Sequence, residues 1–197
     1  MKLPAFYPIV SDVATAEALL EAGVQILQYR NKNFFSRQAF DDASRIAGLC
    51  RSAGALFVVN DRADVAALLN AALHLGQSDL SPADARRILP ASSIIGFSTH
   101  NERQLRAGDT EPVDYLAIGP IFATGSKQNP DPVVGLDRLR ALRPLTPKPL
   151  VAIGGITREL APQVFEAGAD SVAVISDLFP NPRARAKEWL EISLARD

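Results

Sequence analysis

Compact apolar runs alternate with amphipathic stretches along the whole chain, and this alternation constrains the fold more than any other feature. Between the apolar runs, apolar residues recur with helical spacing, as in 36–53, 82–89, 135–143 and 158–167. Strands that are apolar throughout and alternate with helices predict a parallel sheet covered on its outer side. The eight runs with the length and composition of buried strands are 6–11, 25–30, 56–61, 72–76, 93–98, 115–120, 150–155 and 171–176.

A count of eight such units favours closure of the sheet into a (β/α)8 TIM barrel over an open, doubly wound sheet. A chain of 197 residues is near the lower limit of roughly 200 residues for this barrel, so its helices and loops must be short. We therefore expect one domain that spans residues 1–197. Gly23, Gly54 and Gly168 agree with this reading, because each follows a helical stretch and precedes a strand, as a helix C-terminal cap does.

Charge and cysteine content argue against several classes of protein. The net charge is -1 at pH 7 and Lys and Arg form no dense run, so the electrostatic footprint of a nucleic-acid or membrane-surface protein is missing. Cys50 is the only cysteine; it lies on the apolar face of a predicted helix, which favours packing over catalysis. No apolar run is long enough to span a bilayer, and residues 1–4 lead into a strand without the pattern of a secretion signal. We expect a cytoplasmic protein.

Short polar motifs lie at the downstream ends of six of the predicted strands. The carboxyl ends of the strands and the loops after them form one face of a parallel barrel, on which such barrels carry their chemistry. The motifs are therefore predicted to meet in one site, suited to phosphorylated ligands and a divalent metal. They comprise residues 28–32, 60–62, 77–79, 98, 124–127 and 154–155.

Two aspartates form the best candidate for a metal site. Asp61 and Asp79 follow the third and fourth predicted strands, which are neighbours in a parallel barrel. Adjacent strands would hold the two carboxylates close enough to share one cation, and Mg²⁺ commonly uses one or two protein carboxylates together with water and phosphate oxygens. The alternative is that Asp61 caps the helix that begins near Ala63 and that Asp79 lies in a solvated turn.

Cations and glycines in the same motifs point to anion binding. Arg30 and Lys32 follow the second strand and Lys127 follows the sixth, so the three could converge on anionic oxygens, although exposed Arg and Lys residues are usually solubilising surface groups. Residues 154–155, Gly-Gly, close the seventh strand and residues 174–176 close the eighth, where barrels of this type bind phosphate through backbone amides. A glycine pair is also common in tight turns, so by itself it is weak support.

The order and spacing of these motifs resemble the thiamine phosphate synthases, also called thiamine-phosphate pyrophosphorylases. The resemblance runs from about residue 7 to residue 175. It implies a transferase that joins 4-amino-2-methyl-5-(diphosphooxymethyl)pyrimidine to 4-methyl-5-(2-phosphoethyl)thiazole, releasing pyrophosphate, with Mg²⁺ as cofactor. The segments that carry the resemblance are 28–32, 59–62, 74–79, 96–100, 119–127 and 153–156.

The same resemblance implies roles for individual residues. The pyrimidine diphosphate would be held by Gln28, Tyr29, Arg30, Asn31, Lys32, Asn60, Ser98 and Lys127. Of these, the catalytic residues would be Arg30, Lys32, Ser98 and Lys127. The thiazole phosphate would be bound by Thr124, Gly125, Ser126, Gly155, Ile175 and Ser176, and Mg²⁺ by Asp61 and Asp79. Pyrophosphate would leave before the thiazole nitrogen attacks, so no protein nucleophile is expected.

Three departures from the family pattern distinguish this sequence. The usual helix before the first strand is not expected, the first loop is confined to residues 12–14, and residues 123–127 replace a loop richer in proline and threonine. A homo-oligomeric partner could rebuild the part of the pyrimidine pocket wall that the short loop leaves out.

Three alternative functions remain open at this stage. The nearest is a thiazole tautomerase, which would use His100 as its acid-base group without Mg²⁺. The others are a non-catalytic protein that binds a thiamine precursor and a phosphate-binding barrel of unrelated chemistry. His74, inside an apolar run, is interpreted as a hydrogen-bonded core residue and not as a ligand or base.

Overall fold

Eight parallel strands pair in chain order and close into a barrel in the computed structural model, which describes residues 1–31, 36–125 and 131–194. β1 pairs with both β2 and β8, so the sheet has no open edge. This closure confirms the predicted (β/α)8 barrel and excludes an open doubly wound sheet. The strands are β1 (Phe6–Val10), β2 (Ile26–Tyr29), β3 (Leu56–Asn60), β4 (Ala72–Leu75), β5 (Ile95–Thr99), β6 (Tyr115–Ile118), β7 (Leu150–Ile153) and β8 (Ser171–Val174).

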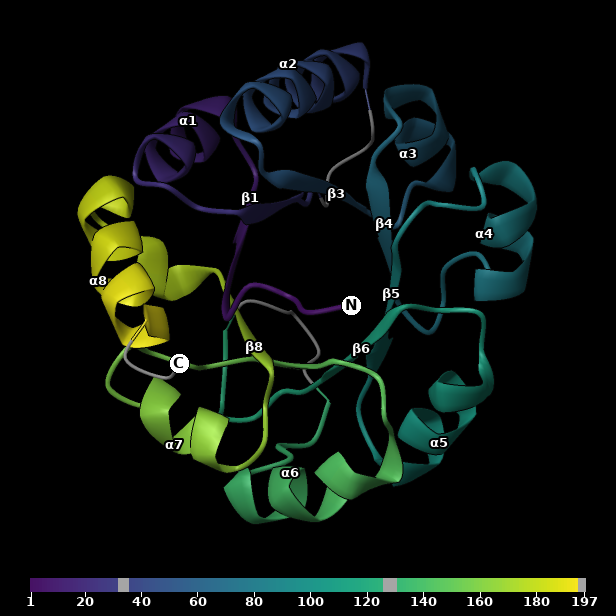
Figure 1. The fold of residues 1–197 in the computed structure, drawn as a ribbon, viewed down its shortest axis with the longest axis vertical. Helices are drawn as coiled ribbons and strands as arrows, with labels where there is room; N and C mark the ends of the chain where they lie inside the picture. The colour runs from purple at the N-terminus through teal and green to yellow at the C-terminus, as the bar shows by residue number, and fades with distance from the viewer. Residues whose placement is uncertain (32–35, 126–130, 195–197) are drawn as a thin grey trace.

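A ring of helices surrounds the barrel (Figure 1). Several of them have only six or seven residues, as the short chain requires. No helix within the described residues is long and apolar enough to cross a membrane. The helices are α1 (Val13–Glu21), α2 (Arg37–Ala53), α3 (Ala63–Leu69), α4 (Pro82–Ile88), α5 (Glu102–Thr110), α6 (Leu136–Leu142), α7 (Ala161–Glu166) and α8 (Pro182–Leu194), with two 3-10 helices, η1 (Arg143–Leu145) and η2 (Ser176–Leu178).

Most element boundaries lie within two residues of their predicted positions. The largest difference is at α7, which begins at Ala161 and not at residue 158, because the segment before it forms a turn. β7 ends at Ile153, so the double glycine lies in the loop after the strand. Gly54 has φ 68° and caps α2 in the left-handed conformation, which glycine adopts without steric cost.

Side chains alternate between two apolar layers along each strand. Leu27 and Val59 face outward and pack in the layer between barrel and helices, whereas Tyr7 and Tyr115 face inward. Leu3 belongs to the inner cluster and is 4% exposed. Figure 1 shows the amino-terminal segment crossing the centre of the ring. The barrel interior is therefore filled at the amino ends of the strands, and polar groups are left to the carboxyl ends.

Candidate functional site

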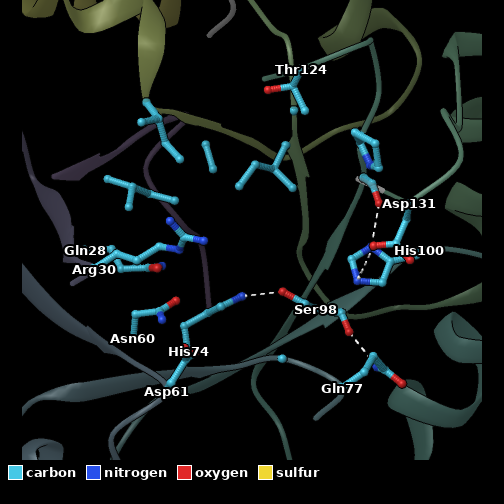
Figure 2. Close-up of a pocket in the computed structure, with 18 of the residues that line it drawn as sticks. Gln28, Arg30, Asn60, Asp61, His74, Gln77, Ser98, His100, Thr124 and Asp131 are labelled. Atoms are coloured by element: carbon cyan, nitrogen blue, oxygen red, sulfur yellow. Dashed lines mark hydrogen bonds and ion pairs between the residues drawn. The ribbon is translucent and has the colours of Figure 1, made fainter. Parts of the chain in front are cut away.

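A cavity of about 370 Å³ opens at the carboxyl ends of the strands (Figure 2). Its lining comes from every strand or strand-end loop, so barrel closure brings together segments that are far apart in the sequence. In Figure 2, Gln28, Arg30 and Asn60 lie on one side, opposite His100 and Asp131. Nine of the predicted site residues line this cavity: Gln28, Arg30, Asn60, Asp61, Asp79, Ser98, Thr124, Gly155 and Ile175.

Four other predicted residues that the structure describes do not line the cavity: Tyr29, Asn31, Gly125 and Ser176. Tyr29 is 1% exposed and packs in the outer apolar layer, because successive side chains of a strand point to opposite faces and Gln28 points inward. The Tyr29 hydroxyl accepts a hydrogen bond from Asn31 Nδ2 at 3.3 Å, and Ser176 is at the start of η2. Lys32, Ser126 and Lys127 lie outside the described residues.

Both candidate metal ligands line the cavity, and Asp61 does not act as a helix cap. The N-cap position of α3 is Arg62, which makes no side-chain cap hydrogen bond. Asp61 has φ 64°, and its backbone N–H donates to the carbonyl of His74 at 2.8 Å, which ties the end of β3 to β4. Asp79 is partly buried, and its Oδ2 accepts the N–H of Gly76 at 2.7 Å. Two carboxylates from neighbouring strands therefore share one cavity.

Arg30 is the only Lys or Arg among the described residues that line the cavity. Its backbone N–H donates to the Val10 carbonyl at 2.8 Å, which extends the pairing of β1 with β2 by one residue. Burial lowers the pKa of the Arg30 guanidinium, and the nearby Asp61 carboxylate opposes that shift. Because arginine stays protonated in proteins, the site keeps a fixed positive charge beside an acidic one.

The double glycine after β7 allows two loops to approach each other closely. Gly154 and Gly155 have φ of 101° and 66°, and the N–H of Phe122, after β6, donates to the Gly154 carbonyl at 3.0 Å. A Cβ at Gly154 would lie 2.6 Å from Pro120 Cβ, and one at Gly155 would lie 2.5 Å from the Ala123 carbonyl oxygen. A side chain at Gly154 or Gly155 would therefore be disfavoured both by the positive φ and by the lack of space.

A partly buried ion pair joins the loops after β7 and β8. Asp177 in η2 accepts hydrogen bonds at 2.9 Å from both Arg158 Nε and Trp189 Nε1. The Arg158 and Asp177 side chains are only 15% and 13% exposed, and Arg158 also pairs with Glu188 of α8. The two loops are thus held by a network that reaches the outer helix.

His74 is a hydrogen-bonded core residue, as predicted, but it also contacts the site. It is 8% exposed; its Nδ1 lies 3.0 Å from the Tyr115 hydroxyl and its Nε2 lies 2.9 Å from Ser98 Oγ (Figure 2). Burial lowers the pKa of His74 to about 4, so the ring is neutral at pH 7. No local pattern indicated that His74 supports Ser98, since 24 positions separate them in the chain.

Other polar residues of the cavity wall have contacts that the sequence did not indicate. Gln77 Nε2 donates to the Ser98 carbonyl at 2.7 Å. His100 Nδ1 lies 2.6 Å from the Gly119 carbonyl oxygen, and His100 Nε2 lies 3.5 Å from Asp131 Oδ2. Asp131 belongs to a segment without helical or strand periodicity, so only its position in the folded cavity wall beside His100 identifies it as part of the site.

Asp61 and Asp79 remain the candidate metal ligands in the described part of the chain. Among residues 1–31, 36–125 and 131–194, no group of three or more His, Cys, Asp and Glu side chains is arranged to hold a metal ion. This excludes a closed zinc-type cage within those ranges, which needs four protein ligands. A pair such as Asp61 and Asp79 is instead the kind of donor set that Mg²⁺ uses, because this ion retains water and substrate oxygens as its other ligands.

The sequence and the fold are both similar to enzymes of thiamine phosphate synthesis. The family described as "Thiamine monophosphate synthase" matches residues 7–178. The "Thiamine-phosphate synthase" of Koribacter versatilis is 51% identical over 205 residues, covering 98% of this chain and 97% of that protein. The "Thiamine-phosphate synthase" of Chloroflexus aurantiacus is 42% identical, covering 84% of this chain and 77% of that protein.

A solved structure agrees with these relatives. The "Thiamine phosphate pyrophosphorylase" from Pyrococcus furiosus superposes with a TM-score of 0.88 at 30% identity, covering 98% of this chain and 96% of that one. The family match spans the motifs at the strand ends, and most of the residues that those motifs contribute line a single cavity. The chain therefore belongs to the thiamine monophosphate synthase family and is an enzyme that forms thiamine phosphate.

Proposed function

We propose that the enzyme condenses 4-amino-2-methyl-5-(diphosphooxymethyl)pyrimidine with 4-methyl-5-(2-phosphoethyl)thiazole, giving thiamine phosphate and pyrophosphate. The supporting observation is that Arg30, two carboxylates and the double-glycine turn line one cavity of about 370 Å³. A cation and a carboxylate pair suit a diphosphate bound with a divalent ion, and a glycine turn suits a second phosphate. The cavity volume lies within the range of roughly 300–1,000 Å³ that is usual for small-molecule sites.

In the proposed reaction, the bond between the pyrimidine methylene carbon and the diphosphate oxygen breaks first. The aminopyrimidine ring stabilises the resulting methylene cation, and the thiazole nitrogen then captures it. Negative charge builds up on the departing diphosphate, so a fixed cation such as Arg30 stabilises the transition state more than the ground state. Lys32 and Lys127 remain predicted to act on the same group.

The remaining wall residues position the reactants. Gln28, Asn60 and Ser98 offer amide and hydroxyl groups to the pyrimidine diphosphate. The neutral thiazole nitrogen already carries the lone pair that forms the new bond, so it needs correct placement and no general base. We therefore assign no nucleophile or base to the protein in this step.

Asp61 and Asp79 are the residues that would hold Mg²⁺. They fit this ion because both carboxylates belong to the cavity wall and follow the adjacent strands β3 and β4. These two strands pair in parallel, with Asn60 opposite His74. When bound, Mg²⁺ neutralises charge on the diphosphate and makes it a better leaving group.

The thiazole phosphate would occupy the side of the cavity formed by the loops after β6, β7 and β8. Thr124, Gly155 and Ile175 line this side. The Arg158–Asp177 ion pair holds two of these loops together, which favours a preformed phosphate site over one that must be ordered by the ligand.

The decisive experiment mixes the purified enzyme with both phosphorylated precursors and Mg²⁺ and measures thiamine phosphate and pyrophosphate together. Equal formation of the two products supports the proposal. Interconversion of thiazole carboxylate phosphate isomers without metal, and without condensation, would assign the cavity to a tautomerase. Tight binding of either precursor without turnover would instead indicate a binding protein.

A further inference from the structure

A chain of hydrogen bonds crosses the barrel interior beneath the cavity and includes three residues that line it, Gln28, His74 and Ser98. Gln28 Nε2 donates to the Tyr7 hydroxyl at 2.8 Å, and the hydroxyls of Tyr7 and Tyr115 are 2.9 Å apart. The Tyr115 hydroxyl lies 3.0 Å from His74 Nδ1, and His74 Nε2 lies 2.9 Å from Ser98 Oγ. The five residues come from five strands, so the chain exists only in the closed barrel.

The chain has one direction because each hydroxyl has a single proton. Gln28 Nε2 can only donate, so the Tyr115 hydroxyl is the one member of the chain that can accept the buried proton of Tyr7. Tyr115 then donates to His74 Nδ1, which leaves the proton of a neutral imidazole on Nε2. His74 Nε2–H consequently donates to Ser98 Oγ, and the proton of the Ser98 hydroxyl is left for a partner in the cavity.

The interior members of the chain are buried. Tyr7, Tyr115 and His74 are 1%, 0% and 8% exposed. Burial raises the pKa of both tyrosine hydroxyls, so both keep their protons at pH 7. A buried chain of neutral groups keeps its polarity, because reversing it would require every proton along it to move together.

The barrel wall contains a space for the central tyrosine. Gly96 lies opposite Tyr115 in the pairing of β5 with β6. A Cβ at Gly96 would lie less than 3.0 Å from three atoms of Tyr115, including its hydroxyl oxygen. The Tyr115 ring also stacks on His74, with centroids 5.5 Å apart. The position of the hydroxyl between Tyr7 and His74 is thus fixed by packing as well as by hydrogen bonds.

We propose that the chain from Gln28 to His74 is a positioning device that holds Ser98 as a hydrogen-bond donor toward the cavity, so that Ser98 recognises an anionic oxygen of the bound substrate. Tyr7, Tyr115 and His74 act through Ser98, and neither tyrosine lines the cavity. The assignment of that oxygen to the diphosphate of the pyrimidine precursor rests on the proposed function. The direction of the hydrogen-bond chain is independent of the proposed function.

The direction can be tested without substrate by NMR spectroscopy of the imidazole nitrogens. The protein has only two histidines, so a sample labelled with ¹⁵N-histidine gives signals from two imidazole rings, and a His100→Gln variant assigns them. We expect His74 at pH 7 to be protonated on Nε2 and unprotonated on Nδ1. A His74 ring protonated on Nδ1 would overturn the proposal, because Ser98 would then donate inward to His74.

The functional link is tested by a double-mutant cycle in the synthase assay. Tyr115→Phe removes the donor to His74 Nδ1 and so weakens the orientation of Ser98. Turnover should fall by about tenfold, the loss expected when the hydrogen bond from Ser98 to the substrate is weakened. Once Ser98→Ala has removed the hydroxyl that the chain orients, adding Tyr115→Phe should cause almost no further loss. Losses that multiply in the double variant would show that Tyr115 does not act through Ser98.

A matched control separates positioning from stability. Ser171→Ala deletes another fully buried hydroxyl, which donates to the Pro4 carbonyl at 2.7 Å at the opposite end of the barrel. This variant should keep the turnover of the original enzyme while losing some stability in thermal unfolding. An equal loss of turnover in Ser171→Ala and Tyr115→Phe would count against a positioning role. If the synthase assay is blank for the unmodified enzyme, the proposed function fails, while the NMR result still decides the direction of the chain.

Discussion

The substitution Gly96→Ala should destabilise the barrel strongly, although it adds only one methyl group. Gly96 has no positive φ, so alanine is allowed there by the backbone and the whole cost comes from space. The added Cβ would lie less than 3.0 Å from Cζ, Cε2 and the hydroxyl oxygen of Tyr115, a ring that is fully buried.

The magnitude follows from two contributions. Overpacking a well-packed core typically costs about 1–3 kcal/mol. Moving the Tyr115 hydroxyl also weakens its two hydrogen bonds, to Tyr7 and to His74, at about 1 kcal/mol each. We therefore expect a loss of about 3–5 kcal/mol in the free energy of unfolding, a large fraction of the roughly 5–15 kcal/mol that stabilises a typical domain.

Equilibrium unfolding in urea measures this loss, and Gly48→Ala is the matched control. Gly48 lies inside α2, and a Cβ added there would meet no other atom within 4 Å, so the same substitution should stabilise the enzyme by about 0.5–1 kcal/mol through helix propensity. In a Tyr115→Leu background, Gly96→Ala should cost much less, because the clashing ring is gone. A Gly96→Ala variant as stable as the original, or a cost unchanged in that background, would refute the packing explanation.

Four further predictions concern the site and its supports. Burial lowers the pKa of His74 from 6.5 to about 4, so between these pH values the unfolded chain takes up a proton that the native enzyme does not. The free energy of unfolding should therefore fall by about 3 kcal/mol as the pH drops from about 6.5 to 4. Urea titrations at a series of pH values measure this fall. Arg30→Ala should reduce turnover by at least about a hundredfold, since the enzyme loses a fixed positive charge that stabilises the leaving group. Arg51→Ala, at an exposed arginine of α2, should leave turnover unchanged. Equal rates for the original enzyme and both variants would contradict the assignment. EDTA should abolish turnover. Asp61→Asn should raise the Mg²⁺ concentration for half-maximal rate by about tenfold or more, and asparagine tolerates the left-handed backbone at this position. An unchanged Mg²⁺ titration would remove Asp61 from the metal site. Asp177→Asn should raise the KM for the thiazole phosphate more than that for the pyrimidine diphosphate, because it removes the charge that ties Arg158 in the loop after β7 to the loop after β8. Equal changes in both KM values would argue against a local role.

Local patterns were sufficient to predict the barrel, and together with the family resemblance they identified nine of the residues that line its cavity. Continuous apolar strands alternating with helices permit little except a parallel sheet covered on its outer side, and eight repeats close it. Polar residues that follow such strands must lie on one face, which is why Arg30, Asp61 and Ser98 could be placed in the site from the sequence.

Neighbouring positions within a motif were harder to separate. The resemblance assigned both Gln28 and Tyr29 to the ligand, yet one residue of shift along a strand reverses the direction of the side chain. Tyr29 therefore packs under the helices, while Gln28 faces the interior. The register of β2 in the closed barrel decides this, and a polar motif at a strand end does not reveal it.

Periodicities over a few residues are enough to establish the repeating unit, the number of repeats and the end of the barrel that carries the chemistry, so these could be predicted from the chain alone. Which distant side chains meet inside the ring depends instead on packing. Tyr7 and Tyr115 are separated by 108 positions and lie in runs that read as ordinary core, yet their hydroxyls are 2.9 Å apart. That contact requires the closure of all eight strands and the space left by Gly96, and both are properties of the packed barrel as a whole.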